Sequence, residues 1–251
     1  MGLKESGLRG SLRSVSTRVG VIPDSDVYRK ATNHWVYDEG SGTLVADRFG
    51  DFDADHTGLD WGDDGDGLTG TYGIYDATSG DHADLGSDSR SHFTDLNNNA
   101  EGAIGCWVNP SNSGSIETIL ASELTGENPA IYLGWRGDLS GWEFNGGSAF
   151  RLEGVGSGTT DWVPIVGTAD GSTARLYFGT DVVEIGSTSA SPQGDGDLEF
   201  NVSISRDTED GGRFWDGGID DLWYSPEPVS VTEIEDWVAD TQDNYSVTES
   251  G

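Results

Sequence analysis

Short runs of alternating apolar and polar residues recur along this chain, separated by glycine-rich turns. Residues 198–205 carry the most regular run, with apolar side chains at every second position from Leu198 to Ile204. Residues 173–178 repeat the pattern. A period of two is typical of a strand with one buried face, and no long run has the period of an amphipathic helix. The pattern predicts an all-β protein of roughly twelve to fourteen short strands.

The strongest candidate for a central strand is residues 101–110, EGAIGCWVNP. Ile104 and Val108 are expected on one face and Trp107 on the other, because successive side chains in a strand point to opposite sides. Cys106 shares the face of Ile104, and as the only cysteine it is interpreted as a small buried hydrophobic residue.

Residues 73–86 are predicted to form paired strands around a turn at Ser79 and Gly80, which are both common turn residues. Further strands are expected at residues 116–122, 130–135, 141–144, 162–168 and 182–185. A length of 251 residues allows one large β-sandwich or two small domains. Because the chain holds nine tryptophans, it has enough large apolar side chains for one sizeable core.

Residues 211–237 combine a predicted strand, a turn and a short helix. Gly217 and Gly218 mark a bulge or a close backbone approach in the strand. Ser230 and Glu233 have the spacing of a capping box, in which each side chain accepts a hydrogen bond from the other residue's amide. The helix is expected to bury one face, formed by Ile234, Trp237 and Val238.

The charge is strongly unbalanced, with 45 acidic residues, 13 basic residues and a net charge of −32. Such a negative field argues against nucleic-acid binding. Regular strand patterns and the aromatic content argue against a disordered acidic chain. The balance is typical of a folded protein adapted to molar salt, where screening weakens self-repulsion. No apolar run reaches the roughly 20 residues of a membrane-spanning helix, so membrane insertion is not expected.

The N-terminal residues 1–30 differ from the rest, because they carry a net charge of +3 while residues 31–251 carry −35. An apolar helical face is flanked by arginines, but two glycines weaken any isolated helix. Two interpretations stay open: an attachment arm that docks on a larger assembly, or a frayed terminus. The docking contacts are expected from Leu3, Leu8, Arg9, Leu12, Arg13 and Val15.

Two distant stretches resemble laminin-G-like domains of the concanavalin A-like superfamily. Residues 218–224, GIDDLWY, resemble the closing strand of these domains, and residues 34–50 resemble their first strand and turn. The matching positions in the first stretch are Glu39, Gly40, Gly42, Asp47 and Gly50. The resemblance implies a two-sheet jelly-roll sandwich over residues 31–240 with a short C-terminal helix. An extended basic N-terminal arm precedes it, and a polar tail, residues 241–251, follows.

The sequence contains no recognisable catalytic motif. Jelly-roll glucanases place closely spaced carboxylates on a strand, but the similar string at residues 233–236 lies on the predicted helix, where the side chains diverge. Neither a Gly-x-Ser-x-Gly elbow nor an HExxH zinc helix is present, and the four histidines lack metal-pair spacing. The chain is therefore predicted not to be an enzyme.

An acidic, glycine-rich loop at residues 60–67 raises the question of a structural Ca²⁺ ion. Asp63 and Asp66 supply the oxygen ligands that Ca²⁺ prefers, although the loop lacks the full EF-hand order. The resemblance to laminin-G-like domains implies that Asp47 and Asp220 complete such a site. The alternative is that acidic loops arise in so acidic a chain without any ion.

A candidate glycan site lies in residues 132–144, YLGWRGDLSGWEF. Exposed tryptophan rings stack on sugars, while arginine and aspartate hydrogen-bond hydroxyl groups. The residues assigned to this site are Trp135, Arg136, Asp138 and Trp142. The alternative, which we favour at this point, is that both tryptophans fill the core.

The opening residues GLRGSLR resemble those of structural proteins in tailed viruses of haloarchaea. This resemblance implies a virion structural protein at the virion surface, as a capsid turret or decoration protein. Its arm would contact other virion proteins, host surface glycans would be its external ligands, and repeated docking sites favour a homo-oligomer. The alternatives are a tail fibre or receptor-binding protein, or a halophilic cell-surface lectin or adhesin. The absence of a recognisable signal peptide counts against the adhesin.

Overall fold

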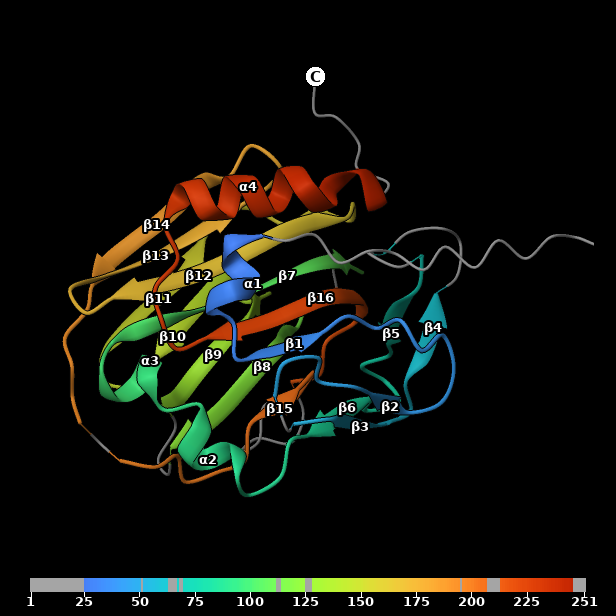
Figure 1. The fold of residues 1–251 in the computed structure, drawn as a ribbon, viewed down its shortest axis with the longest axis horizontal. Coiled ribbons are helices and arrows are strands. Elements are labelled where there is room, and N and C mark those ends of the chain that lie inside the picture. The colour runs from blue at the N-terminus through green and yellow to red at the C-terminus, as the bar shows by residue number, and fades with distance from the viewer. Residues whose placement is uncertain are drawn as a thin grey trace, which may run out of the picture.

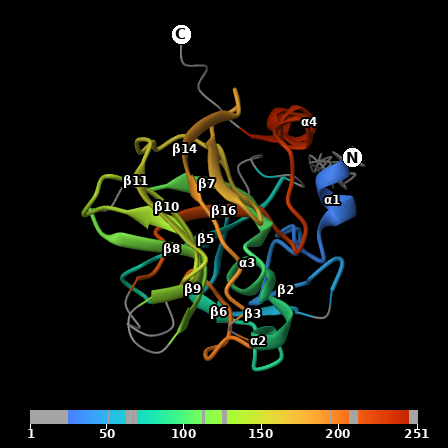
Figure 2. The same ribbon diagram turned by 90° about the vertical axis from the view of Figure 1, so that its left-hand side faces the viewer.

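The computed structural model describes residues 25–50, 52–62, 67, 70–111, 114–124, 128–194, 196–206 and 213–245. These residues form two antiparallel β-sheets packed face to face, as predicted. Helices α1 (Asp26–Lys30) and α4 (Val231–Thr241) lie against the outer face of the first sheet (Figures 1 and 2). The outer face of the second sheet is covered by neither of these helices.

The first sheet has the strand order β14-β13-β12-β7-β16-β5-β4, and β1 also pairs with β16. Its strands are β1 (Asn33–Trp35), β4 (Asp60–Gly62), β5 (Tyr72–Tyr75), β7 (Glu101–Pro110), β12 (Val163–Asp170), β13 (Thr173–Phe178), β14 (Val183–Ser189) and β16 (Gly217–Ser225).

The second sheet has the strand order β11-β10-β9-β8-β15-β6-β3-β2. Its strands are β2 (Leu44–Val45), β3 (Ala54–Thr57), β6 (His82–Asp84), β8 (Ile116–Leu124), β9 (Asn128–Arg136), β10 (Gly141–Gly146), β11 (Phe150–Val155) and β15 (Ser203–Ile204). The short helices are α2 (Ser89–His92), α3 (Asp95–Asn98) and η1 (Gln242–Asn244). None of the helices in the described part of the chain is long and apolar enough to cross a membrane.

The two faces of β7 separate two hydrophobic cores, as its alternation predicts. Ile104, Cys106 and Val108 point into the core between the sheets. Trp107 and Ala103 point the other way, into a second core beneath α1 and α4. The first sheet is therefore the middle layer of three, buried on both faces.

Two predictions about strands are wrong. Residues 73–86 do not form a hairpin: β5 belongs to the first sheet and β6 to the second, so the intervening turn carries the chain between sheets. Of residues 198–205, only Ser203–Ile204 is a strand. The amides of Leu198 and Val202 instead donate to the Arg90 carbonyl and to the Ser89 hydroxyl. The alternating sequence pattern therefore does not mark a strand here, and Ser203 and Ser205, at the polar positions of that pattern, are fully buried.

The closing strand β16 contains both a close approach and a bulge. Gly217 has φ +133°, and a Cβ atom there would lie 2.1 Å from the Asn109 carbonyl oxygen, which requires glycine. The register shift lies further along, between Asp220 and Trp223, where Asp221 has φ +50°. The bulge therefore centres on Asp221, three residues beyond the glycine pair.

The capping box of α4 is confirmed. The Glu233 amide donates to Ser230 Oγ at 3.3 Å, and the Ser230 amide donates to Glu233 Oε2 at 2.7 Å. The helix buries its apolar face against the first sheet through Ile234, Trp237 and Val238, as predicted.

Both ends of the folded unit extend beyond the predicted boundaries. Val27 and Tyr28, assigned to the arm, are buried in the second core. Tyr245, assigned to the polar tail, is also buried and donates to Asp220 Oδ2 at 2.9 Å. Because these side chains cover apolar surface of the first sheet, the boundaries at residues 31 and 240 fall inside the packed unit. Residues 1–24 of the predicted arm lie outside the described residues.

A buried histidine makes the stability of this sandwich depend on pH. His56 on β3 is 3% exposed, and its Nδ1 atom lies 3.1 Å from the Tyr75 hydroxyl, which also contacts the Tyr37 hydroxyl at 2.7 Å. Burial lowers the pKa of His56 from 6.5 to about 3. Between these values the unfolded chain binds a proton that the folded chain does not, so stability falls as the pH falls.

We expect the free energy of unfolding of the wild type to fall by about 1.4 kcal/mol per pH unit more than that of H56Q below pH 6.5. Glutamine keeps a polar partner for Tyr75 but does not titrate. Chemical denaturation at constant molar salt from pH 7 to pH 4 measures the difference. If the free energies of unfolding of the two proteins changed with pH in parallel, the lowered pKa of His56 would be contradicted.

Candidate functional site

Charged side chains gather on the outer face of the second sheet, where β9, β10 and β11 lie side by side. Figure 2 shows these strands on the side of the sandwich away from α1 and α4. Arg136 is the last residue of β9, and Glu143 of β10 and Glu153 of β11 face it across the sheet. The alternation that turns Trp142 and Phe144 inward turns Glu143 outward.

The guanidinium of Arg136 contacts three carboxylates. Its Nε and Nη2 atoms donate to the two oxygens of Asp138, each at 2.9 Å. Its Nη1 atom donates to Glu153 Oε1 at 2.7 Å and to Glu143 Oε2 at 3.2 Å. Such a two-pronged pair with Asp138 fixes the plane of the guanidinium.

Two further residues complete the arrangement. Asn145 donates to Glu143 Oε1, and its own side-chain oxygen accepts from the Leu152 amide at 3.1 Å. Arg151 lies 2.5 Å from Glu153 Oε1. The name Arg136 cluster is used below for Arg136, Asp138, Glu143, Asn145, Arg151 and Glu153.

The Arg136 cluster runs from a buried centre to an exposed rim. The Glu143 side chain is 3% exposed, whereas Asp138 is 50% and Arg151 45% exposed. Burial raises the pKa of Glu143, against the opposing effect of Arg136. Hydrogen bonds from Arg136 lower the pKa of Asp138. The rim therefore presents fixed donors and acceptors to solvent, anchored on a charged group that the sheet holds in place.

The structure brings together two of the four residues predicted for a glycan site. Arg136 and Asp138 form the bidentate pair, but Trp135 and Trp142 lie in the core between the sheets, at 8% and 0% exposure. Their rings pack edge to face at a centroid distance of 5.3 Å. Because Trp135 precedes Arg136 in a strand, the two side chains must point to opposite faces. A stacking platform made by these two tryptophans is therefore excluded.

Four members of the Arg136 cluster were not found from the sequence: Glu143, Asn145, Arg151 and Glu153. Glu143 and Asn145, and likewise Arg151 and Glu153, have the i, i+2 spacing of residues on one face of a strand. This spacing is the sequence pattern from which they could have been predicted. No strand was predicted over residues 150–155, so Arg151 and Glu153 had no assigned sheet face. The register that places Glu143 and Glu153 beside Arg136, and Asn145 opposite Arg151, is set only in the assembled sheet.

The predicted calcium ligands have different surroundings. Asp47 accepts hydrogen bonds from the amides of His34 and Phe49 and from the Asn33 side chain, so its oxygens organise a loop. Asp220 is buried and accepts from Tyr245. Among the residues that the structure describes, no three His, Cys, Asp or Glu side chains gather in a way that could hold a metal ion.

Asp63 and Asp66 lie outside the described residues, and a calcium site in their loop stays a prediction. The same is true of the predicted docking residues Leu3, Leu8, Arg9, Leu12, Arg13 and Val15.

A second polar cluster is completely buried and joins the helices to the first sheet. Asp221 Oδ2 accepts hydrogen bonds from the Tyr28 hydroxyl at 2.7 Å and from Trp237 Nε1 at 2.9 Å. Asp221 Oδ1 lies 2.6 Å from His34 Nε2, and neither side chain is exposed. Because solvent does not reach these groups, the cluster holds the fold together and offers no surface to a ligand.

The comparisons with known proteins agree with this architecture. Residues 77–235, more than half of the chain, match the family Laminin_G_3, described as the concanavalin A-like lectin/glucanases superfamily. The chain therefore belongs to this superfamily, and the family predicted from the sequence is confirmed. No curated protein matches the sequence.

Solved structures with the same fold share little sequence with this chain. Domain 4 of AbnA, a GH43 extracellular arabinanase from Geobacillus stearothermophilus in complex with arabinotriose, is 15% identical with a TM-score of 0.60, over 83% of this chain and 98% of that one. Trypanosoma rangeli sialidase is 14% identical with a TM-score of 0.61, over 90% of this chain and 34% of the sialidase. The chain thus spans about a third of the sialidase, and the likeness shows the fold alone.

The binding domain of botulinum neurotoxin serotype D/C VPI 5993 also has this fold. It is 10% identical with a TM-score of 0.55, over 86% of this chain and 53% of that one.

Proposed function

We propose that this member of the concanavalin A-like lectin/glucanase superfamily is a non-catalytic carbohydrate-binding protein of a virion surface. The proposed carbohydrate binding is supported by the Arg136 cluster. It holds charged donors and acceptors in fixed positions on a sheet face that α1 and α4 leave uncovered. Sugar hydroxyl groups both donate and accept, so they complement such a surface.

The geometry of the same cluster argues against catalysis. A glycosidase needs its two carboxyl groups on either side of the bond that it cleaves. Here the Arg136 Nη1 atom lies within hydrogen-bonding distance of both Glu143 and Glu153 and occupies the space between them. Glu143 is also nearly inaccessible. The pair is suited to hold Arg136 in place, and we infer that the protein binds sugars without cleaving them.

Glycan binding is expected to depend on the exposed rim. D138A and R151A should each weaken binding about ten- to a hundredfold, because a hydrogen bond to a charged group contributes about 1.5–3 kcal/mol. Both variants keep the contact between Arg136 and buried Glu143, so the fold should persist. Binding is measured in molar KCl on a glycan array that includes arabinotriose.

R48A is the matched control, because Arg48 forms a partly exposed ion pair with Asp38 outside the Arg136 cluster. If R48A, D138A and R151A bound the glycans of the array equally well, the Arg136 cluster would not be part of the binding surface.

The virion part of the proposal is supported by the sequence. The opening residues resemble those of structural proteins in haloarchaeal tailed viruses, and the acid excess suits a protein exposed to brine. Since Val27 and Tyr28 belong to the packed unit, residues 1–24 are the stretch proposed to contact other virion proteins. We propose a homo-oligomeric capsid turret or decoration protein, with a tail fibre or receptor-binding protein as the alternative.

Immunogold electron microscopy of a producing lysate in molar salt tests this location, with antibody against residues 31–251. Gold on particle heads supports a turret or decoration protein, and gold on tails supports a fibre. Label confined to cell envelopes ends the virion proposal and favours a cell-surface adhesin.

A further inference from the structure

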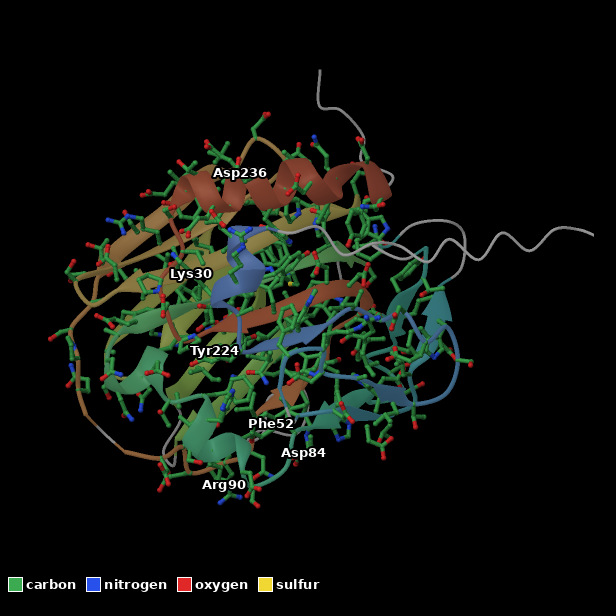
Figure 3. All side chains as sticks on the ribbon, viewed as in Figure 1. Lys30, Phe52, Asp84, Arg90, Tyr224 and Asp236 are labelled. Carbon is green, nitrogen blue, oxygen red and sulfur yellow. The ribbon has the colours of Figure 1, made fainter. Side chains whose placement is uncertain are left out.

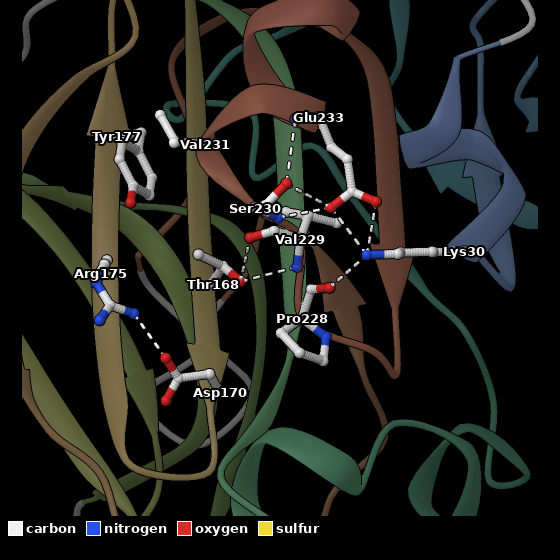
Figure 4. Close-up of a pocket in the computed structure, with 10 residues that line it drawn as sticks. All are labelled: Lys30, Thr168, Asp170, Arg175, Tyr177, Pro228, Val229, Ser230, Val231 and Glu233. Atoms are coloured by element: carbon white, nitrogen blue, oxygen red, sulfur yellow. Dashed lines mark hydrogen bonds and ion pairs between the residues drawn. The ribbon is translucent and has the colours of Figure 1, made fainter.

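We propose that a pocket between the outer face of the first sheet and the start of α4 binds a neutral, polyhydroxylated glycan residue. This second subsite rests on the proposed carbohydrate-binding function but lies on the opposite side of the sandwich from the Arg136 cluster. The pocket has a volume of about 380 Å³ (Figure 4). That volume falls within the range of small-molecule sites.

Three separate parts of the chain form the pocket. Thr168 and Asp170 come from β12, and Arg175 and Tyr177 from β13. Lys30 reaches in from the end of α1, and the opposite wall is formed by Pro228, Val229, Ser230, Val231 and Glu233 (Figure 4). The side chains of the second core pack α1 and α4 against the first sheet. The pocket therefore depends on this packing.

The apolar part of the lining suits the carbon face of a sugar. Tyr177, Val229 and Val231 line the pocket together with Pro228. Tyr177 and Val229 are only 8% and 4% exposed, so most of the accessible apolar surface comes from Pro228 and Val231. Val231 is 40% exposed, so an apolar side chain meets solvent at the pocket.

The charged part of the lining is balanced. Lys30 lies 2.6 Å from Glu233, and Arg175 lies 2.8 Å from Asp170. Figure 4 shows these two ion pairs on opposite walls. A charged ligand would be repelled by one member of each pair. A hydroxyl group accepts from the cation and donates to the carboxylate, so both pairs can persist around a neutral polyol.

The wall formed by residues 228–233 is fixed before any ligand arrives. Glu233 accepts from the Ser230 amide and hydroxyl at 2.7 and 2.8 Å, and Lys30 also donates to the Pro228 carbonyl at 2.9 Å. The Thr168 hydroxyl bonds both the amide and the carbonyl of Val229. Such preorganisation lowers the entropic cost of binding.

The test is nuclear magnetic resonance titration of the full ¹⁵N-labelled chain in molar KCl. The probes are D-arabinose, D-galactose, D-glucose and D-mannose, with D-galacturonate and D-glucosamine as charged comparisons. We expect the neutral sugars to shift amide signals of residues 168–177 and 229–233. V231W should abolish these shifts by filling the pocket, while V183W, at a 54% exposed position on β14, should keep them.

No shift at these residues with any neutral sugar, or shifts that survive in V231W, would overturn the subsite. If the charged sugars bound as tightly as the neutral sugars, the proposal that the subsite selects neutral ligands would be wrong. If V231W does not fold, R175M is compared with R48M in the same way. D138A separates this proposal from the first: it should leave these shifts intact, so failure of one site does not imply failure of the other.

Discussion

Replacing Asp221 with alanine is expected to cost about 3–5 kcal/mol of folding stability, the effect of breaking a buried charged cluster by removing one partner. The substitution leaves the Tyr28 hydroxyl, Trp237 Nε1 and His34 Nε2 without their shared acceptor in a site that excludes solvent. These donors come from α1, α4 and β1, so the loss loosens both helices from the first sheet. Denaturant unfolding in molar salt, followed by tryptophan fluorescence, measures the change.

D221N separates the charge from the backbone conformation. Asparagine tolerates the left-handed conformation that Asp221 adopts at φ +50°, and it keeps one oxygen acceptor. It should therefore lose less than D221A, about 1–3 kcal/mol. D236N is the matched control, because Asp236 is exposed on α4 (Figure 3), and its effect should stay within about 0.5 kcal/mol. If D221A unfolded at the same denaturant concentration as D236N, the cluster would have no structural role.

Replacing Trp142 with alanine is expected to cost about 3–5 kcal/mol, as for other large-to-small changes in a core. The ring is fully buried between the sheets and contacts Trp135, Trp215 and Phe178 at centroid distances of 5.3, 6.3 and 5.6 Å. Its Nε1 atom also donates to the Ser157 carbonyl. Thermal and denaturant unfolding measure the loss, and the same samples are applied to the glycan array.

This result checks the core position of Trp142. A loss of glycan affinity in W142A with an unchanged unfolding midpoint would contradict that position. A core residue loses stability instead. W61A is the comparison, because Trp61 lies on β4 and is only partly buried, so its loss should be clearly smaller.

The sequence determined the features that depend on neighbouring residues. The period of two in residues 101–110 set which side chains of β7 face each core, because pleating alternates side chains whatever the partner strand. Ser230 and Glu233 defined the start of α4 through contacts within one helical turn. The family signal in the closing strand and the first strand was also local, and it identified the sandwich.

The tertiary structure decided which distant residues meet. Arg136 contacts Glu143 and Glu153 because β9, β10 and β11 are neighbours in a particular register, and a shift of one residue would turn these side chains to the other face. Asp221 meets Tyr28 across 193 positions of sequence. Residues 73–86 failed as a hairpin for the same reason, since strand partners depend on the packing of the whole sandwich. Periodicity fixes the face of a side chain, and only the assembled sheets fix its neighbours.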